Sequence, residues 1–163
     1  MIFAIDPGNV ESAYCLISPD DMRPIMFAKV KNPAIMDCIS ANKKHIHAAA
    51  IEMIASYGMP VGREVFETCV WIGRFARELE LAKIPVHFIY RKDEKMELCY
   101  NPTASDANIR RALIDRFASH DLKSGKGTKK NPDWFYGFFS DVWAAYAVGV
   151  TYLEQQKRGE TNG

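Results

Sequence analysis

Residues 1–17, MIFAIDPGNVESAYCLI, contain two apolar runs separated by a polar turn, and Asp6 immediately precedes that turn. This pattern is the starting point for the fold prediction. Residues 1–5 and 13–18 are short and continuously apolar, which is typical of buried strands, and the Pro7-Gly8-Asn9 turn can join antiparallel strands. Asp6 ends the first run. A buried carboxylate is unfavourable without a partner. Asp6 therefore either caps the turn that follows it or belongs to a polar site.

The rest of the chain alternates between strand and helix patterns. Residues 62–83 have apolar side chains at i, i+3, i+4 and i+7, the spacing of an amphipathic helix. The other predicted elements are strands over 24–30, 45–55 and 86–90, a weak helix over 33–43, a helix over 105–118 capped by Ser105 or Asp106, a loop over 120–132, and a helix over 140–156 capped by Ser140. Three strands followed by alternating strands and helices predict an α/β fold with a mixed sheet.

Composition limits the class of protein. The chain has 163 residues, a net charge of +1, 48% hydrophobic and 25% charged residues, which fits one globular domain. We expect that domain to cover residues 1–157, with a polar tail at 158–163. No segment approaches the roughly 20 apolar residues of a membrane span, and no secretory signal is visible. The four cysteines form no CxxC pair, which favours buried reduced thiols. We therefore expect a cytoplasmic protein.

Two further acids resemble Asp6 in their placement. Glu52 lies near the end of a second apolar strand, where open α/β sheets place ligand sites. Asp141 opens the last predicted helix on the face of Ala145 and Val148, although an acid at a helix N-terminus is also stabilising by itself. Converging carboxylates repel one another unless a cation neutralises them. Oxygen ligands favour Mg²⁺ or Mn²⁺.

Three stretches carry a resemblance to a known family. AIDPGNVESAYCLI, AAAIEMIASYGMPVG and SDVWAAYAVGV are similar to the motifs of RuvC-type Holliday junction resolvases of the RNase H-like superfamily. IEMIASYGMPVGREVFETCVWIGRF and GTKKNPDWFYGFFSDVWAAYAV resemble RuvC-like proteins of bacteriophages in particular. The similarity runs from Met1 to about Glu154. The first motif alone is weak, since actin-like ATPases also carry an acid and a glycine after a strand.

The resemblance implies an RNase H-like, five-stranded mixed sheet flanked by helices, with strand 1 beside strand 4. Asp6, Glu52 and Asp141 would then be the catalytic residues and would hold Mg²⁺ or Mn²⁺, with two ions per active site. Bacterial RuvC enzymes carry a fourth carboxylate one helical turn before the last acid, and Phe138 stands there in this chain. Asp106 is the main candidate to replace it as a metal ligand, unless it is a helix cap. Asp133 is a weaker candidate.

DNA binding requires cations, and these gather in three places. The candidate DNA-binding residues are Arg91, Lys92 and Lys95 after a strand, Arg110 and Arg111 on a helix, and Lys123, Lys126, Lys129 and Lys130 in the glycine-containing loop. The loop lysines have the alternative of being merely solvated. By resemblance, Tyr57 lies near the junction centre and stacks on a base, or else it belongs to the core.

The resemblance also implies a function and a partner. We predict a metal-dependent, structure-selective endodeoxyribonuclease that resolves Holliday junctions and other branched DNA, in the cytoplasm of a bacterial host cell if the protein is phage-encoded. The alternative is a branched-DNA-binding module with weak or no cleavage. A four-way junction offers two symmetry-related strands, so a homodimer is expected. We place its interface on the helix over 62–82, with Trp71 and Phe75 exposed.

Overall fold

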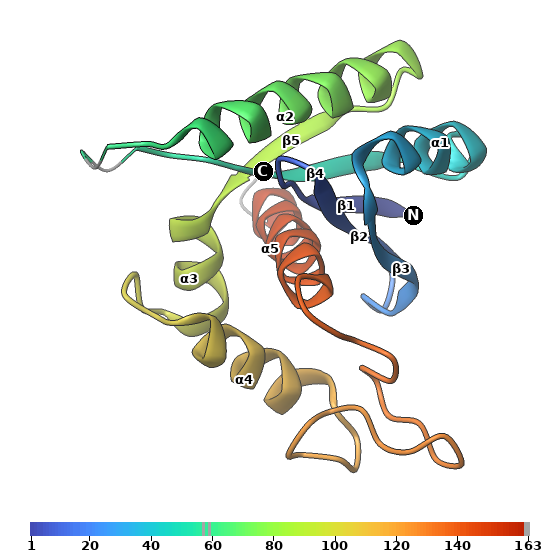
Figure 1. Ribbon diagram of the computed structural model, residues 1–163. Coiled ribbons are helices and arrows are strands. Elements are labelled where there is room, and N and C mark those ends of the chain that lie inside the picture. The colour runs from blue at the N-terminus through green and yellow to red at the C-terminus, as the bar shows by residue number, and fades with distance from the viewer. Residues whose placement is uncertain (57, 59, 162–163) are drawn as a thin grey trace.

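The computed structural model describes residues 1–56, 58 and 60–161, and its helices and strands follow the sequence prediction closely (Figure 1). The strands are β1 (Ile2–Asp6), β2 (Glu11–Ile17), β3 (Pro24–Lys31), β4 (Ala48–Met53) and β5 (Val86–Tyr90). The helices are α1 (Asn32–Asn42), α2 (Arg63–Leu81), α3 (Arg91–Cys99), α4 (Asp106–Phe117) and α5 (Val142–Thr161).

The strands form one mixed sheet in the order β3-β2-β1-β4-β5. β1, β2 and β3 make an antiparallel meander, whereas β4 runs parallel to β1 and β5 runs parallel to β4. Parallel neighbours need a crossover connection, which α1 supplies before β4 and α2 supplies before β5. The mixed five-stranded sheet flanked by helices is therefore confirmed.

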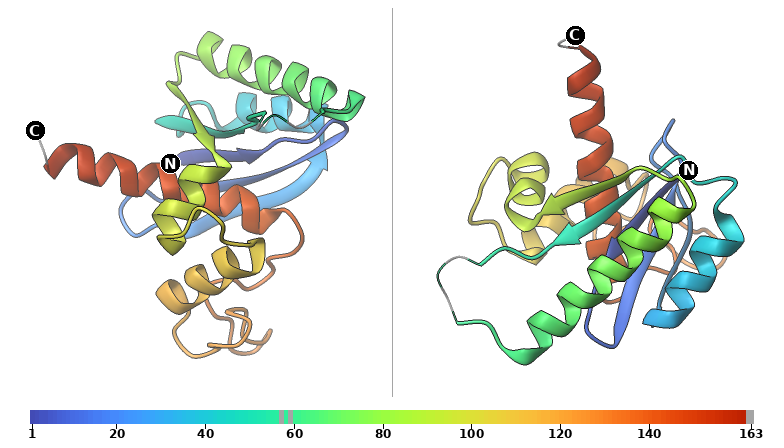
Figure 2. Two further views of the ribbon diagram at one scale, coloured as in Figure 1. Left: turned by 90° about the vertical axis from the view of Figure 1, so that its left-hand side faces the viewer. Right: turned by 90° about the horizontal axis from the view of Figure 1, so that it is seen from above.

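The helices cover both faces of the sheet (Figure 2). α1 and α2 pack on one face with Phe3, Ile5 and Ile51. α5 lies across the other face, with α4 packed beyond it, on the side of Ile2, Ala4 and Ala50. Since successive side chains of a strand point to opposite faces, each strand contributes to both cores. α5 approaches the sheet closely because Gly149 lacks a side chain: a Cβ there would lie 2.3 Å from Ile17 Cδ1 and 2.9 Å from Ala4 Cβ.

Several local predictions need correction. Residues 91–99, where the sequence predicts no helix, form α3. α5 continues to Thr161, so most of the residues assigned to a polar tail are helical. All four cysteines are free thiols, but only Cys15 is buried: Cys38 and Cys99 are half-buried, and Cys69 is exposed. None of the helices in the described ranges combines the length and apolar character needed to span a bilayer.

The surface expected on α2 also differs from the prediction. Phe75 is fully buried, and Trp71 is half-buried, with its ring tilted against that of Phe75 at 5.7 Å between centroids. Phe75 instead contributes to the core beneath α2. The exposed large apolar side chains of this helix are Phe66 and Val70, one turn apart, and Leu81 at its end. Phe66 and Val70 therefore replace Trp71 and Phe75 as the candidate apolar contact residues of α2.

Candidate active site

Asp6 and Glu52 lie side by side at the ends of two neighbouring parallel strands. Ile5 of β1 pairs with Ile51 of β4, so the next residues along each strand are Asp6 and Glu52. Asp6 and Glu52 lie two residues after Ala4 and Ala50, whose side chains face α5. Since every second side chain of a strand points to the same face, the acids also point toward the α5 side. Two carboxylates are thus brought to the face that α5 covers, as the resemblance implied.

The turn after Asp6 is held by other residues. The Gly8 N–H donates to Ser12 Oγ at 3.1 Å, and Ser12 Oγ donates to Asn32 Oδ1 at 2.6 Å. Asn32 Nδ2 in turn donates to the Gly8 carbonyl at 2.9 Å. A Cβ at Gly8 would lie 2.3 Å from the Glu11 carbonyl oxygen, so the turn requires glycine. Ser12 and Asn32 are buried and fix this turn, which favours a site role for Asp6 over a capping role.

The Asp6 and Glu52 carboxyl groups interact directly. Burial, the negative charge of Glu52 and a hydrogen bond to Glu52 raise the pKa of Asp6 to about 8. Burial also raises the pKa of Glu52, and the positive charge of Arg91 opposes that rise. The pair therefore shares a proton near neutral pH when no cation is bound, because two adjacent buried carboxylates resist full ionisation.

Asp141 reaches the same region from the beginning of α5. Its carbonyl accepts the N–H of Ala145 at 3.0 Å, so Asp141 and not Ser140 occupies the N-cap position. Its negative charge contributes to the raised pKa of Asp6. The Asp141 carboxylate is bound by Lys29 Nζ at 2.6 Å. The three predicted catalytic acids are thus electrostatically coupled, and Asp141 is held by a lysine.

Lys29 was not predicted as a site residue. It lies on β3, where Lys29 pairs with Ala13, and Ala13 pairs with Asp6 on the other side. Lys29 and Asp6 therefore share one row across the sheet, with only a small alanine between them. The signal in the sequence was the spacing of Phe27 and Lys29. Residues two apart on a strand share a face, and Phe27 packs on the α5 side.

Glu94 is a second residue that the sequence analysis missed. It lies on α3 with a fully buried side chain. Burial and the negative charge of Glu52 raise the pKa of Glu94 well above its ordinary value. Arg91 Nη1 donates to Glu94 Oε2 at 2.6 Å. The sequence signal was an Arg91/Glu94 pair at i, i+3, but it becomes visible only once residues 91–99 are known to be helical.

Asp106 binds the other side of the same guanidinium group. Arg91 Nη2 forms an ion pair with Asp106 Oδ1, and the Asp106 side chain is 86% exposed. Burial by itself would lower the pKa of Arg91, but Glu94 and Asp106 raise it above its ordinary value. The N-cap of α4 is Ser105, whose side chain accepts the N–H of Asn108. The capping role considered for Asp106 is therefore wrong, and its predicted role as a metal ligand stays a prediction.

The other candidates for a fourth acid have structural surroundings. Phe138 is buried within an aromatic cluster and packs edge-on against Phe27 at 4.6 Å between ring centroids. Burial would raise the pKa of Asp133, but hydrogen bonds from the backbone N–H groups of residues 119–121 and 134 hold it far below its ordinary value. Asp133 thus fastens the end of α4 to the loop that follows.

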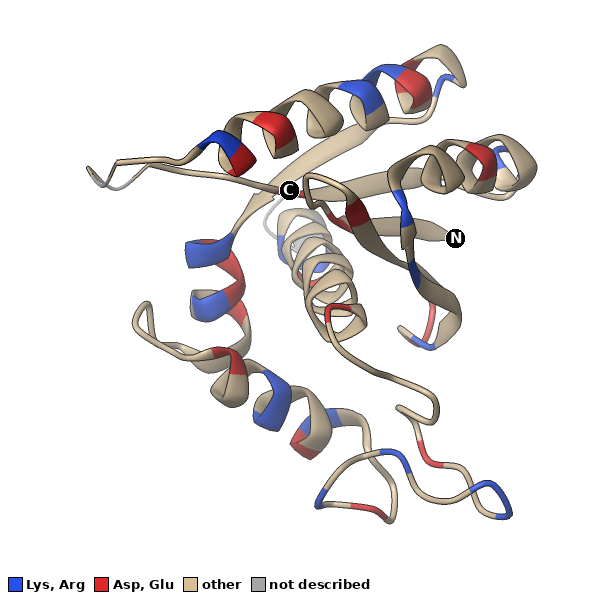
Figure 3. Cartoon of the chain, in the orientation of Figure 1, with Lys and Arg blue, Asp and Glu red and all other residues tan. Residues whose placement is uncertain are grey.

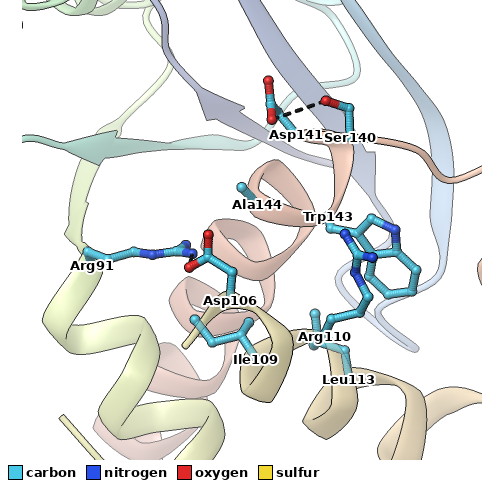
Figure 4. A pocket seen from close by; sticks show the side chains of 9 residues that line it. All are labelled: Arg91, Asp106, Ile109, Arg110, Leu113, Ser140, Asp141, Trp143 and Ala144. Carbon is cyan, nitrogen blue, oxygen red and sulfur yellow. Dashed lines mark hydrogen bonds and ion pairs between the residues drawn. The ribbon is translucent and has the colours of Figure 1, made fainter. Parts of the chain in front are cut away.

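A pocket of about 190 Å³ connects Asp141 with the Arg91 network (Figure 4). Asp141 lies at one end of it, and the Arg91–Asp106 pair lies at another. Arg110 projects beside Trp143, with its guanidinium carbon 5.0 Å from the ring centroid. The pocket therefore has both negative and positive walls. A group carrying a phosphate and a bound cation would find a partner for each.

The predicted DNA-binding cations separate into groups. Arg91, Lys92 and Lys95 line a second pocket on α3 together with Pro102. Arg111 forms an ion pair with Asp115, and its Nη1 donates a hydrogen bond to the Leu122 carbonyl at 2.7 Å. Tyr57, predicted to stack on a base, lies outside the described residues.

The loop that carries the predicted lysines Lys123, Lys126, Lys129 and Lys130 extends beyond α4 at the bottom of Figure 3. Asp121 orders the first part of this loop. Its carboxylate accepts backbone N–H groups from Ser124 at 3.0 Å and from Gly127 at 2.9 Å. Lys123, Lys129 and Lys130 are exposed, and Lys126 is half-buried. The lysines are thus presented on a hydrogen-bonded scaffold, at a distance from the acids along α4.

The acids offer carboxylate oxygens, the donor atoms that hard divalent cations prefer. Across residues 1–56, 58 and 60–161, no three His, Cys, Asp or Glu side chains converge closely enough to form a complete metal site as they stand. Asp6 and Glu52 nevertheless stand at the ends of adjacent strands, where repulsion between their carboxylates favours neutralisation by a cation. Asp141 becomes a third donor if it leaves Lys29. The residues therefore fit Mg²⁺ or Mn²⁺.

The order of the strands and the helices on both faces of the sheet match the RNase H-like fold. The Thermus thermophilus RuvC structure matches with a TM-score of 0.71, at 15% identity, over 97% of this chain and 96% of that one. T. thermophilus RuvC in complex with Holliday junction substrate matches with a TM-score of 0.69, at 15% identity, over 97% and 95%. No protein-family model matches this chain, and no curated protein is significantly similar in sequence. These comparisons show that the chain shares its fold with T. thermophilus RuvC.

Proposed function

We propose that this protein is a metal-dependent, structure-selective endodeoxyribonuclease that nicks Holliday junctions and other branched DNA. The observation that carries the proposal is the arrangement of Asp6, Glu52 and Asp141 on the α5 face of the sheet, with Lys29 and Arg91 beside them. The full-length fold similarity to T. thermophilus RuvC, which has been solved with a Holliday junction, supports the choice of substrate.

Asp6, Glu52 and Asp141 are the residues that would hold Mg²⁺ or Mn²⁺, with two ions per active site. Bound there, such ions supply neutralisation of the carboxylates, an activated water and stabilisation of the leaving oxygen. The protein contributes rigid placement, since Asp6 and Glu52 stand on adjacent strands and Asp141 is fixed at the start of a buried helix. Hydrolysis is expected to leave 5′-phosphate and 3′-hydroxyl ends.

The cations around the acids would bind the DNA backbone. The α3 pocket with Arg91, Lys92 and Lys95 adjoins the pocket that contains Arg110 and Asp141, because Arg91 lines both. The lysine loop beyond α4 would contact a different part of a branched substrate. Contacts of this kind to phosphates give affinity that depends on salt and little on sequence. Tyr57 remains a proposed stacking residue.

A homodimer is proposed because a four-way junction presents two equivalent strands. Phe66 and Val70 give α2 an exposed apolar surface at 61% and 54% exposure. An apolar patch on an otherwise charged helix is typical of a protein contact. Two copies joined there would each bring one acid site to the junction.

A branched-DNA-binding module with weak or no cleavage is the second candidate. It is favoured by two observations: Phe138 replaces an acid in a buried aromatic cluster, and Lys29 holds Asp141. Both observations reduce the number of carboxylates ready to accept a cation. The fold and the DNA-binding surface would be the same in either case.

A cleavage assay separates the two candidates. End-labelled four-way junction, fork and linear duplex would be incubated with the protein and Mg²⁺ or Mn²⁺, with binding measured in parallel in Ca²⁺. The nuclease proposal expects nicks in the branched substrates and little cutting of the duplex. Junction binding with intact strands in both metals would favour the binding module.

A further inference from the structure

Glu94 is a buried acid whose hydrogen bonding is incomplete. The residue is fully buried on α3, and within the described part of the chain its Oε1 has no hydrogen-bond partner. Its other oxygen accepts from Arg91 Nη1 at 2.6 Å. Placing a carboxylate in such surroundings is costly, and an apolar residue of similar size would serve stability as well or better. The placement of Glu94 therefore calls for a role other than stability.

Arg91 is the residue that Glu94 holds. Arg91 directly follows β5, whose last residue, Tyr90, pairs with Met53, so Arg91 emerges next to the β4 end that carries Glu52. Its positive charge acts on both Asp6 and Glu52. The Arg91 side chain is 25% exposed and lines both the pocket that contains Asp141 and the second pocket on α3. Arg91 is therefore the cation that joins the acid site to the α3 surface.

The two partners of Arg91 differ in how firmly they can hold it. Glu94 is inaccessible to solvent, whereas Asp106 is largely exposed and lies on the pocket wall, where water and salt weaken its attraction. A guanidinium group presents several N–H donors in a fixed fork and binds phosphate oxygens in pairs. An incoming phosphate can therefore compete for the donors that face Asp106, while Glu94 keeps the guanidinium in place.

We propose that Glu94 is a positioning residue that holds the Arg91 guanidinium beside the Asp6–Glu52 pair, where Arg91 binds a phosphate of the branched DNA. This inference rests on the proposed function, because it assumes that DNA enters the acid site. Arg91 would contact one phosphate, and Glu94 would affect DNA binding only by positioning Arg91.

The test compares Arg91→Ala, Glu94→Gln and the double variant in a junction-binding assay in Ca²⁺ over a range of salt concentrations. Arg91→Ala should weaken binding about tenfold, as for loss of a charged hydrogen-bonding partner, and should reduce the slope of log Kd against log salt by about one. Glu94→Gln should reduce the same slope in part. The double variant should match Arg91→Ala, because Glu94 has no effect once Arg91 is absent.

Glu97→Gln is the matched control, since it makes the same chemical change on the same helix at an acid paired with Arg158. A Glu94→Gln slope equal to that of Glu97→Gln, or losses that add in the double variant, would overturn the inference. If Glu94→Gln does not fold, Arg91→Lys decides: a lysine cannot bind Glu94 and phosphate through one planar fork, so wild-type binding by Arg91→Lys would also overturn it. Binding is scored without cleavage. A protein that binds in this way but never cuts would contradict the proposed nuclease activity and leave the Glu94 result intact.

Discussion

Lys29 Nζ lies 2.6 Å from Asp141 Oδ2, joining the edge strand β3 to the beginning of α5 across the acid site. The side chains are 31% and 46% exposed, so water screens the pair and its strength is moderate. Hydrogen bonding to Asp141 raises the pKa of Lys29, which keeps the lysine charged. Lys29 thus occupies Asp141 and competes with any cation that the acids would bind.

Replacement of Lys29 should therefore strengthen cation binding. Lys29→Met frees the Asp141 carboxylate and removes a positive charge, and we expect the Mn²⁺ dissociation constant to fall about two- to fivefold, corresponding to an exposed ion pair of roughly 0.5–1 kcal/mol. Isothermal titration calorimetry measures this directly. Lys44→Met removes an exposed lysine elsewhere and serves as the control. Equal Mn²⁺ affinity in the wild type and Lys29→Met would show that the ion pair does not compete with metal.

Asp6 should destabilise the metal-free protein at neutral and alkaline pH. Its pKa is raised to about 8, so the folded state keeps a proton that the unfolded state loses near pH 4. Stability therefore falls as pH rises between about 4 and 8. Asp6→Asn removes this dependence and should raise the free energy of unfolding by about 1–3 kcal/mol at pH 8 in EDTA, and by much less at pH 5.

Urea unfolding at the two pH values, with a chelator present, measures this difference. Saturating Mg²⁺ should stabilise the wild type and have little effect on Asp6→Asn, because ligand that binds only the folded state adds to its stability. An Asp6→Asn protein that is less stable than the wild type at pH 8 in EDTA would contradict the account of a strained acid pair.

Asp133 should behave in the opposite way. Its lowered pKa comes from backbone hydrogen bonds that require the ionised carboxylate. This stabilisation is complete above the unfolded pKa near 4 and is lost as pH falls toward the lower folded pKa. Asp133→Asn should lower the free energy of unfolding by about 2 kcal/mol at pH 7, with a smaller difference at pH 3.

Asp115→Asn is the control for that experiment, because it removes the same charge from an exposed ion pair with Arg111. Denaturant unfolding provides the measurement. If Asp133→Asn and Asp115→Asn unfold alike at pH 7, Asp133 does not fasten the loop to α4.

The dimer proposal predicts that α2 is sensitive to charge. Phe66→Glu places an acid in the exposed apolar patch and should raise the dimer dissociation constant at least about tenfold without unfolding the monomer. Sedimentation equilibrium at micromolar protein, with and without junction DNA, tests this. Ile25→Glu is the control at a similarly exposed apolar residue on β3. A wild type that is monomeric under all of these conditions would rule out the proposed dimer.

Asp6, Glu52 and Asp141 were predictable because strand and helix periodicity determine their positions. Asp6 and Glu52 stand at the ends of two continuously apolar strands, and Asp141 stands where the last apolar helix begins. The pairing of β1 with β4 came only from the resemblance, because periodicity does not specify which strands are neighbours. The register of these strands confirms it.

Glu94 and Lys29 could not be found in the same way. Glu94 lies in a run of charged residues that reads as exposed, and its burial depends on the packing of α3 against α4 and α5. Lys29 lies two strands from Asp6, at a distance that only the register of the meander determines. The burial of Phe75 was missed because α2 offers two apolar surfaces, and only the structure shows which one covers the sheet.

The central claim is that Asp6 and Asp141 serve metal-dependent cleavage and not junction binding. The most direct measurement is nicking of a labelled four-way junction in Mn²⁺ by the wild type, Asp6→Asn and Asp141→Asn, beside junction affinity in Ca²⁺. We predict that both variants bind within about threefold of the wild type, since removing a charge from an acid does not remove a phosphate contact, while the nicking rate falls by at least about a thousandfold. Nicking by either variant at the wild-type rate would contradict the account.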